Sequence, residues 1–185
     1  MFDNSTGKWV LLTFTDKHLK HHKPLIMEGL VLYRSYFGNT RQIAEAIGKQ
    51  LAEAGYDPVL CDVREKLPDL SRVAFIFLGS PTRMARVNRK AKKILKLLEK
   101  KKVAQPLVIF DTYGPVPSDA EELMKAKKWI EPGAAGILAA RAQACGLNVY
   151  GKTLRCEVTY LKGPLGEHEV EKAMTFTKEF LATLA

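Results

Sequence analysis

Along this chain, short apolar runs of strand length alternate with longer stretches in which apolar residues recur every three or four positions. The runs predict five strands, at 30–33, 56–63, 73–79, 106–111 and 154–161. The stretches with helical spacing predict helices at 40–54, 88–101, 118–130, 134–145 and 167–184. The run 73–79 is apolar throughout, which is typical of a central strand covered on both faces, whereas Pro58 favours an edge position for the second strand.

This alternation predicts an α/β fold, because strands that alternate with helices form right-handed βαβ units around a parallel sheet. Five strands fit a doubly wound sheet of order 2-1-3-4-5 with helices on both faces. In that order, ligands bind at the carboxyl ends of the strands, where the first and third strands lie side by side. The segments 34–40, 80–87 and 111–117 follow the first, third and fourth strands. We therefore expect these three segments to meet at one site.

The first 28 residues do not follow the alternation. A short strand is predicted at 9–15, followed by a basic stretch, 17–23, that holds His18, His21 and His22 and ends before Pro24. Histidines can bind metals, but no acidic residue or cysteine lies in this stretch, so no metal site is predicted. We expect residues 1–28 to form an extension outside the core and residues 29–185 to form the domain.

The composition favours a single globular domain over a membrane protein or a disulfide-rich protein. A chain of 185 residues with 46% apolar residues is long enough for one domain with a substantial core. No apolar run approaches the roughly 20 residues that cross a bilayer, and no secretory signal is evident, so no membrane partner is expected. Cys61, Cys145 and Cys156 are odd in number and form no C-x-x-C motif, which favours a reducing cytoplasm over a disulfide framework.

The positive charge is concentrated in one stretch. The net charge is +9, and the stretch from Arg83 to Lys102 alone holds ten basic residues and one acid, Glu99. Such a run of basic residues is often a solvated helix face. The concentration of the positive charge in one stretch also suggests an acidic partner protein or an anionic ligand. Nucleic acid is a less favoured partner, because no aromatic residues for base stacking are interleaved with the charges.

The segment between the first strand and the first helix has the chemistry of a phosphate site. It comprises Ser35, Tyr36, Phe37, Gly38, Asn39 and Thr40. The first N–H groups of a helix have no partner within the helix, and the helix dipole adds positive potential there. A phosphate could accept hydrogen bonds from these groups and from the Ser35 and Thr40 hydroxyls. Asn39 or Thr40 could instead serve only as a helix N-cap.

The two other segments at this edge offer different chemistry. The first supplies Pro81, Thr82, Arg83 and Met84, and the second supplies Thr112, Tyr113 and Gly114. Thr82 and Arg83 could donate to carbonyl or phosphate oxygens. Tyr113 could stack on a planar ring, or it could pack on its own loop. A phosphate at one end and a stacked ring at the other describe flavin mononucleotide (FMN).

Residues 35–40 resemble the phosphate loop of the flavodoxins, which carry Ser/Thr-x-Thr/Tyr/Phe-Gly-Asn-Thr at this place. The sequence Gly79-Ser80-Pro81-Thr82-Arg83 resembles the flavin loop of flavodoxin-like NAD(P)H:quinone oxidoreductases of the tryptophan-repressor-binding type. The Thr-Tyr-Gly at 112–114 matches the second flavin-contacting loop. The resemblance covers about 29–185 and implies a flavodoxin-like fold, FMN as cofactor and the thirteen residues above as its contacts.

One departure concerns the loop beside the flavin. Family members with the Pro-Thr-Arg sequence often have a glycine two residues after the arginine, where this chain has Ala85. An alanine resists positive φ, so this loop is expected to be less free to change its backbone next to the flavin.

These observations favour FMN-dependent electron transfer by a flavodoxin-like protein whose basic helix, 88–101, docks an acidic redox partner. The first alternative is an FMN oxidoreductase that takes hydride from NAD(P)H, with the same basic residues attracting the nucleotide. The second is a flavin-free module that binds an acidic protein or nucleic acid. No residue is predicted to act as a catalytic nucleophile, because the flavin supplies the redox chemistry.

Overall fold

The computed structural model describes residues 2–3, 8–9 and 27–184 of the chain. Phe2–Asp3 (β1) and Lys8–Trp9 (β2) pair as two antiparallel strands. Most of the strand predicted at 9–15, and the residues His18, His21 and His22, lie outside the described residues. The division into an extension at 1–28 and a domain at 29–185 therefore stays a prediction.

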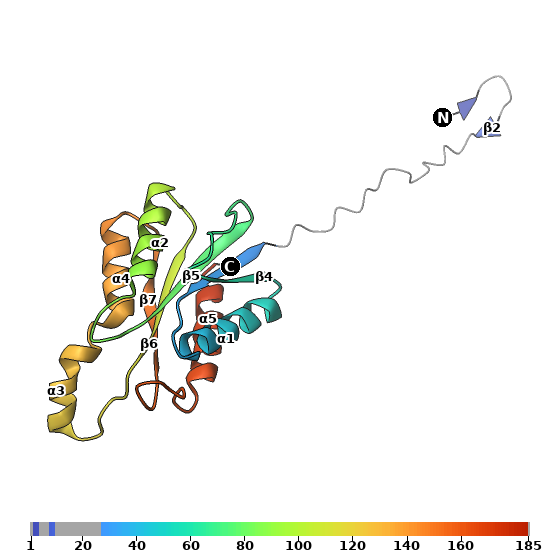
Figure 1. The fold of residues 1–185 in the computed structure, drawn as a ribbon. Helices are drawn as coiled ribbons and strands as arrows, with labels where there is room; N and C mark the ends of the chain where they lie inside the picture. Colours follow the sequence, from blue (N-terminus) through green and yellow to red (C-terminus); the bar gives the residue numbers. More distant parts are fainter. Residues whose placement is uncertain (1, 4–7, 10–26, 185) are drawn as a thin grey trace.

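A five-stranded parallel sheet forms the centre of the domain (Figure 1). Its strands are Glu28–Tyr33 (β3), Asp57–Asp62 (β4), Val73–Pro81 (β5), Leu107–Tyr113 (β6) and Val149–Glu157 (β7). They lie in the order β4-β3-β5-β6-β7, which is the predicted order 2-1-3-4-5. The predicted doubly wound fold is therefore confirmed, and β4, with Pro58, is an edge strand as expected.

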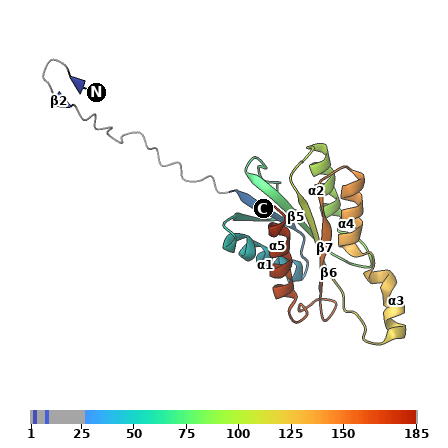
Figure 2. The same ribbon diagram turned by 180° about the vertical axis from the view of Figure 1, so that it is seen from behind.

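Helices cover both faces of the sheet. The five helices of the described chain are Asn39–Glu53 (α1), Arg89–Lys100 (α2), Ala120–Ile130 (α3), Gly133–Ala144 (α4) and Glu169–Ala182 (α5). Helices α1 and α5 lie together on one face, and α2 and α4 lie on the other (Figures 1 and 2). Among the described residues, no helix is long and apolar enough to cross a membrane.

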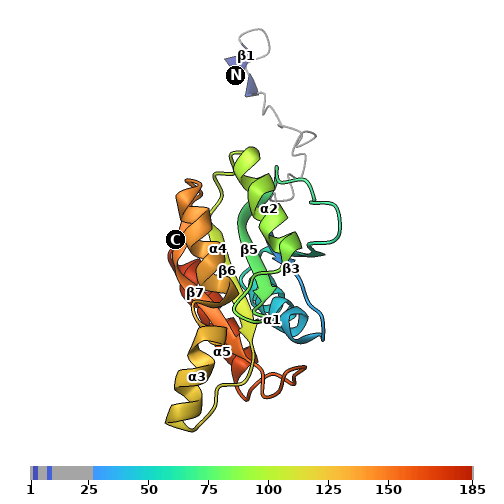
Figure 3. The ribbon, with the colours of Figure 1, turned by 60° about the vertical axis from the view of Figure 1, so that its left-hand side comes forward.

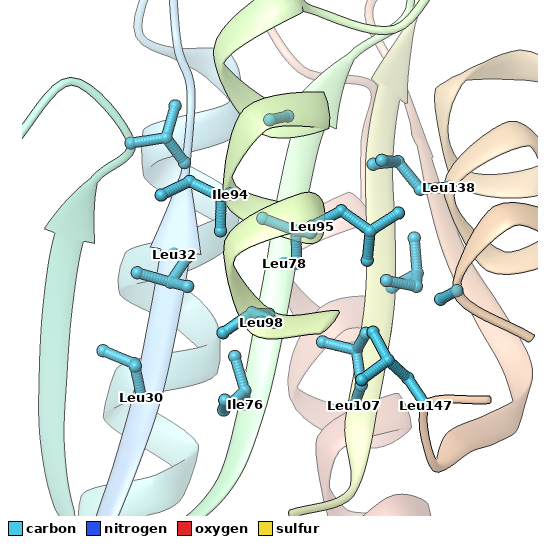
Figure 4. Close-up of a cluster of buried hydrophobic side chains, with 14 of the residues drawn as sticks. Leu30, Leu32, Ile76, Leu78, Ile94, Leu95, Leu98, Leu107, Leu138 and Leu147 are labelled. Atoms are coloured by element: carbon cyan, nitrogen blue, oxygen red, sulfur yellow. The ribbon is translucent and has the colours of Figure 1, made fainter. Parts of the chain in front are cut away.

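The two faces of the central strands explain why these runs are apolar throughout. Leu30 and Leu32 of β3 and Ile76 and Leu78 of β5 pack beneath α2, against Ile94, Leu95 and Leu98 (Figure 4). The residues between them point to α1 and α5, where the rings of Phe75 and Phe77 meet Phe180 edge to face at centroid distances of 5.2 and 5.4 Å. Full burial of such a side chain contributes about 1.5–3 kcal/mol, so both faces stabilise the fold.

Helix α3 differs from the other four helices. It has no buried residue and lies beyond the carboxyl end of the sheet, apart from both helical layers (Figure 3). Its first backbone groups are capped by Asp119, whose carboxylate accepts from the Glu122 N–H at 2.9 Å. The sequence predicted this helix from residue 118, whereas α3 begins at Ala120, because the Asp119 carboxylate and not the Ser118 hydroxyl caps it.

The last strand also differs from its predicted bounds. Pairing with β6 fixes β7 at Val149–Glu157, whereas the sequence predicted 154–161. Tyr160 and Leu161, which looked like the apolar end of a strand, belong to a loop and are 70% and 85% exposed. The apolar character of these two residues therefore marks a surface and not a buried strand.

Candidate functional site

The segments that follow β3, β5 and β6 meet at one cavity of about 570 Å³ at the carboxyl edge of the sheet. The thirteen predicted contacts lie on these segments, and twelve of them line the cavity; Gly38 does not. Those that line it are Ser35, Tyr36, Phe37, Asn39, Thr40, Pro81, Thr82, Arg83, Met84, Thr112, Tyr113 and Gly114. The fold therefore brings the predicted residues together, although their contacts with a cofactor stay a prediction.

The first loop turns directly into helix α1. Gly38 has φ +96°, a left-handed conformation that side chains disfavour, and α1 begins at the next residue. The Gly38 N–H donates to the Ser35 hydroxyl at 3.1 Å, which closes the turn. No side chain caps α1, so neither Asn39 nor Thr40 acts as its N-cap. The first N–H groups of α1 therefore have no side-chain cap, and the first two residues of the helix, Asn39 and Thr40, line the cavity, as an anion site at a helix amino end requires.

The Thr40 hydroxyl lies at the junction of the first and third loops. It is buried and forms a hydrogen bond of 2.7 Å with the Thr112 hydroxyl, in which either oxygen can be the donor. Because each hydroxyl carries a single proton, one member of the pair still has a proton to donate to another acceptor. The pair thus joins β6 to the start of α1, and one of the two hydroxyls at the cavity wall keeps a proton to donate.

Tyr36 connects the first loop to the basic helix. The Asn88 side-chain amide donates to the Tyr36 hydroxyl at 2.6 Å, and Asn88 is also the N-cap of α2. The guanidinium carbons of Arg34 and Arg83 lie 4.4 and 5.0 Å from the centre of the Tyr36 ring. These cation–π contacts hold two positive charges beside the ring, close to the start of α2.

Thr82 has a structural role that the sequence did not indicate. Its hydroxyl donates to the Asp111 carboxylate at 2.7 Å and accepts from the Ala134 N–H at 2.6 Å. The same carboxylate oxygen accepts from the Ala135 N–H at 3.1 Å. The expected donation of the Thr82 hydroxyl to a ligand is therefore not what this conformation shows, because its proton is used inside the protein.

Tyr113 lines the cavity with an arginine against its ring. The guanidinium of Arg155 lies 4.5 Å from the ring centre. It also donates two hydrogen bonds, one to the Asp111 carboxylate at 3.1 Å and one to the Ile130 carbonyl at 2.8 Å. Burial raises the pKa of the Tyr113 hydroxyl, so this ring is neutral at physiological pH. The contacts fix the orientation of the ring and join it to the carboxyl end of α3.

Two parts of the cavity wall were not predicted from the sequence. Helix α3 contributes Ala126, Trp129 and Ile130, and the loop after β7 contributes Val158, Leu161 and Lys162. Ala126 and Ile130 are four positions apart, so they lie on one side of the helix. The helical spacing over 118–130 and the presence of Trp129 were the available sequence signals, but neither indicates which part of the domain the helix faces.

The loop at Arg83–Arg86 has an uncommon backbone. Arg83 and Arg86 exchange two backbone hydrogen bonds, of 2.9 and 3.2 Å, and the two residues between them have φ +49° (Met84) and +55° (Ala85). Two positive φ angles define a type I′ turn, which usually contains Asn and Gly. Ala85 thus adopts the conformation that alanine was expected to resist, and its N–H donates to the Trp129 carbonyl at 3.0 Å.

We expect Ala85→Gly to stabilise the protein by about 1 kcal/mol, because a left-handed conformation costs about that much for a residue with a Cβ. Urea unfolding followed by circular dichroism measures the change. Ala140→Gly, in the exposed part of α4, is the matched control and should destabilise the protein by about 0.5–1 kcal/mol. A midpoint for Ala85→Gly that does not rise would contradict the prediction.

The cavity fits FMN in chemistry and size. The amino end of α1 and the nearby hydroxyls suit a phosphate. Tyr36, Tyr113 and Trp129 offer apolar surfaces to a flat ring, and no acidic residue of the described chain lines the cavity. Its volume of about 570 Å³ lies within the usual range of cofactor sites. The fold and the site together define a doubly wound α/β protein with a cavity at the switch point whose lining suits a phosphate and a flat ring.

Comparisons with known proteins identify the family. The family model described as a flavodoxin domain matches residues 30–154, so the chain belongs to the flavodoxin-domain family. The expectation that its cofactor is FMN is thereby confirmed, as is its general role in electron transfer.

Several solved structures share the fold. A flavodoxin from the domain Archaea is 22% identical, with a TM-score of 0.65 over 85% of this chain and 98% of that one. Flavodoxin 2 from Bacillus cereus is 23% identical, with a TM-score of 0.64 over 85% and 99%. The rubredoxin oxygen:oxidoreductase of Desulfovibrio gigas is 14% identical, with a TM-score of 0.55 over 85% of this chain and 37% of that one. No curated protein sequence matches the chain significantly.

Proposed function

We propose that this protein carries electrons on FMN to or from an acidic redox protein, which docks on the basic residues between Arg83 and Lys102. The observation that supports this most is that these charges lack carboxylate ion-pair partners in the described part of the chain. Within the described residues, no carboxylate forms an ion pair with any of the ten basic side chains of this stretch. Nine of the ten are exposed, and Lys92 is half-buried.

The position of α2 supports docking close to the cofactor. Its buried residues, Ala91, Ile94, Leu95 and Leu98, face the sheet, which leaves the lysines outward. Its N-cap, Asn88, contacts Tyr36 of the cavity wall, so the amino end of α2 lies at the cavity and its carboxyl end leads away from it. An acidic partner attracted to the amino end of α2 would approach the mouth of the cavity. Attraction between opposite charges raises association rates by about 10- to 1,000-fold.

The redox chemistry is that of the bound flavin, and the chain binds and orients it. We propose that the N–H groups of α1, with Ser35 and Thr40, hold the phosphate and that Tyr36, Tyr113 and Trp129 enclose the ring. Three cysteines without disulfide bonds are consistent with a cytoplasmic location. The first test is the absorbance spectrum after FMN is added and excess is removed by gel filtration. A protein without flavin bands would contradict the proposal.

The partner's charge is tested with one acceptor in two forms. Native cytochrome c is basic, and succinylation of its lysines makes it acidic with the same haem. We expect the reduced, FMN-loaded protein to reduce the succinylated form about 10-fold faster or more at low salt, and the advantage to shrink as salt is added. Stopped-flow absorbance measures both rates. Equal rates, or a faster reaction with the native form, would contradict an acidic partner.

Charge-reversal variants locate the docking site. Arg86→Glu with Lys90→Glu changes the cavity end of the basic stretch, and Lys96→Glu with Lys100→Glu changes the far end by the same net charge. The first pair should slow reduction of the succinylated form more than the second. Fast oxidation of NADPH by the FMN-loaded protein alone would instead favour the oxidoreductase alternative, in which these charges attract the nucleotide.

A further inference from the structure

A fourth loop, from Val158 to Leu165, lies at the cavity beside the phosphate loop. Val158 and Leu165 pair as an antiparallel bridge, and the Thr159 N–H donates to the Pro164 carbonyl at 2.9 Å. At the tip, the Gly163 N–H donates to the Tyr160 carbonyl at 3.0 Å and closes a turn. The loop is therefore a closed structure with a defined tip.

The tip of this loop packs on the first residue of α1. The Asn39 side-chain amide donates to the Lys162 carbonyl at 3.0 Å. Gly163 has φ +107°, and a Cβ at this position would lie only 2.4 to 2.9 Å from side-chain atoms of Asn39. A glycine is needed here for both the conformation and the close approach. The backbone of Lys162 is thereby fixed at the amino end of α1.

The Lys162 side chain extends into the cavity region. It lines the cavity together with Ser35, Phe37 and Thr40, and its ammonium nitrogen lies 6.0 Å from the centre of the Phe37 ring. Within the described residues, no carboxylate forms an ion pair with it. Its positive charge is therefore not neutralised by a carboxylate of the described chain.

Only two charged residues line the cavity within the described chain, Arg83 and Lys162, and both are positive. Arg83 is engaged with the ring of Tyr36, near the start of α2. Lys162 is held at the start of α1, where a phosphate would accept from the helix N–H groups. The FMN phosphate carries between one and two negative charges at neutral pH, so a mobile ammonium at this place can pair with it.

We propose that Lys162 is a specificity residue of the cofactor site: its ammonium pairs with the FMN phosphate and selects FMN over riboflavin. The proposal rests on FMN as the cofactor. The helix N–H groups and the hydroxyls form one side of the phosphate site, and the Val158–Leu165 loop supplies a cation from another part of the chain. Lys162 lies far along the sequence from the motif at 35–40, so inspection of that motif alone does not reveal this charge.

The test compares the binding of FMN and riboflavin, which differ only in the phosphate. Quenching of flavin fluorescence on titration with the full chain gives both dissociation constants. For Lys162→Met we expect FMN binding to weaken about 10-fold or more and riboflavin binding to stay within about 2-fold. Lys162→Arg should retain the preference, and added salt should weaken FMN binding less in Lys162→Met than in the unchanged protein.

Lys178→Met is the matched control, because Lys178 is exposed on α5 and its loss changes the net charge equally. It should leave both constants unchanged. Unchanged FMN binding in Lys162→Met, or equal weakening of FMN and riboflavin, would overturn the role of Lys162 alone. If the unchanged protein bound neither flavin, the assignment of the cofactor would fail, and this proposal with it.

Discussion

Replacement of Asp111 by alanine should destabilise the protein by about 3–5 kcal/mol, which is typical of the removal of one partner from a buried ion pair. The Asp111 side chain is fully buried and accepts from Arg155, from the Thr82 hydroxyl and from the Ala135 N–H. The change would leave the Arg155 side chain, which is 24% exposed, without its carboxylate partner. It would also remove the group that joins β5, β6, β7 and the start of α4.

Urea unfolding of the protein without flavin measures this effect. Asp111→Asn should cost less than Asp111→Ala, because an amide oxygen can still accept one of the hydrogen bonds. Lys152→Ala removes an ion pair with Glu179 whose side chains are both exposed, and it should leave the midpoint nearly unchanged. If Asp111→Ala unfolded within about 1 kcal/mol of the unchanged protein, the cluster would not stabilise the fold as argued.

A double variant separates the contribution of the Asp111–Arg155 ion pair to stability from that of the other contacts of Asp111. Asp111→Ala combined with Arg155→Met removes both charges, so no unpaired guanidinium remains. Its cost should be smaller than the sum of the two single changes, because the two residues share one interaction. A cost equal to the sum would show that the two side chains stabilise the fold independently.

Removal of the two hydroxyls of the phosphate loop should have the largest effect on cofactor binding. In the Ser35→Ala, Thr40→Val variant, we expect FMN affinity to fall about 100-fold or more. Each hydrogen bond to a charged group contributes about 1.5–3 kcal/mol, and 1.4 kcal/mol corresponds to a factor of ten. Riboflavin affinity should change little, because riboflavin has no phosphate. Fluorescence titration with both flavins gives the two affinities.

The variant also loses two internal contacts, namely the Gly38–Ser35 and Thr40–Thr112 hydrogen bonds. Its unfolding midpoint must therefore be measured beside the affinities. Ser71→Ala with Thr175→Val removes two exposed hydroxyls elsewhere in the described chain and serves as the control. An FMN affinity equal to that of the unchanged protein would exclude the two hydroxyls as phosphate ligands.

The local pattern of the sequence was sufficient for the strand order and for the position of the site. Runs such as 73–79 are apolar throughout because both faces of a central strand are covered, and this requirement is visible in the sequence itself. Because the carboxyl ends of parallel strands lie at one edge of the sheet, the loops at 34–40, 80–87 and 111–117 were expected to lie close together. Twelve of thirteen predicted contacts accordingly line one cavity.

The sequence pattern gave wrong or incomplete predictions where the same residue types can occur in two kinds of local structure. Tyr160 and Leu161 resembled the end of a strand, but pairing with β6 ends β7 at Glu157 and leaves both residues exposed. Ser118 and Asp119 are both good N-caps, and the choice between them depends on the path of the chain after Pro117. Ala85 has positive φ because backbone hydrogen bonds with neighbouring segments hold the turn, which propensity alone does not anticipate.

The sequence by itself determined the α/β class, the order of the strands and which loops meet at the cavity, because each depends on the pattern of residues along the chain. Only the tertiary structure decided which side chains complete the site. Arg155 reaches Asp111 across 44 positions, and Asn39 reaches the Lys162 carbonyl across 123. Such contacts depend on strand register and on where distant loops pack, and these are set by the burial of the whole core.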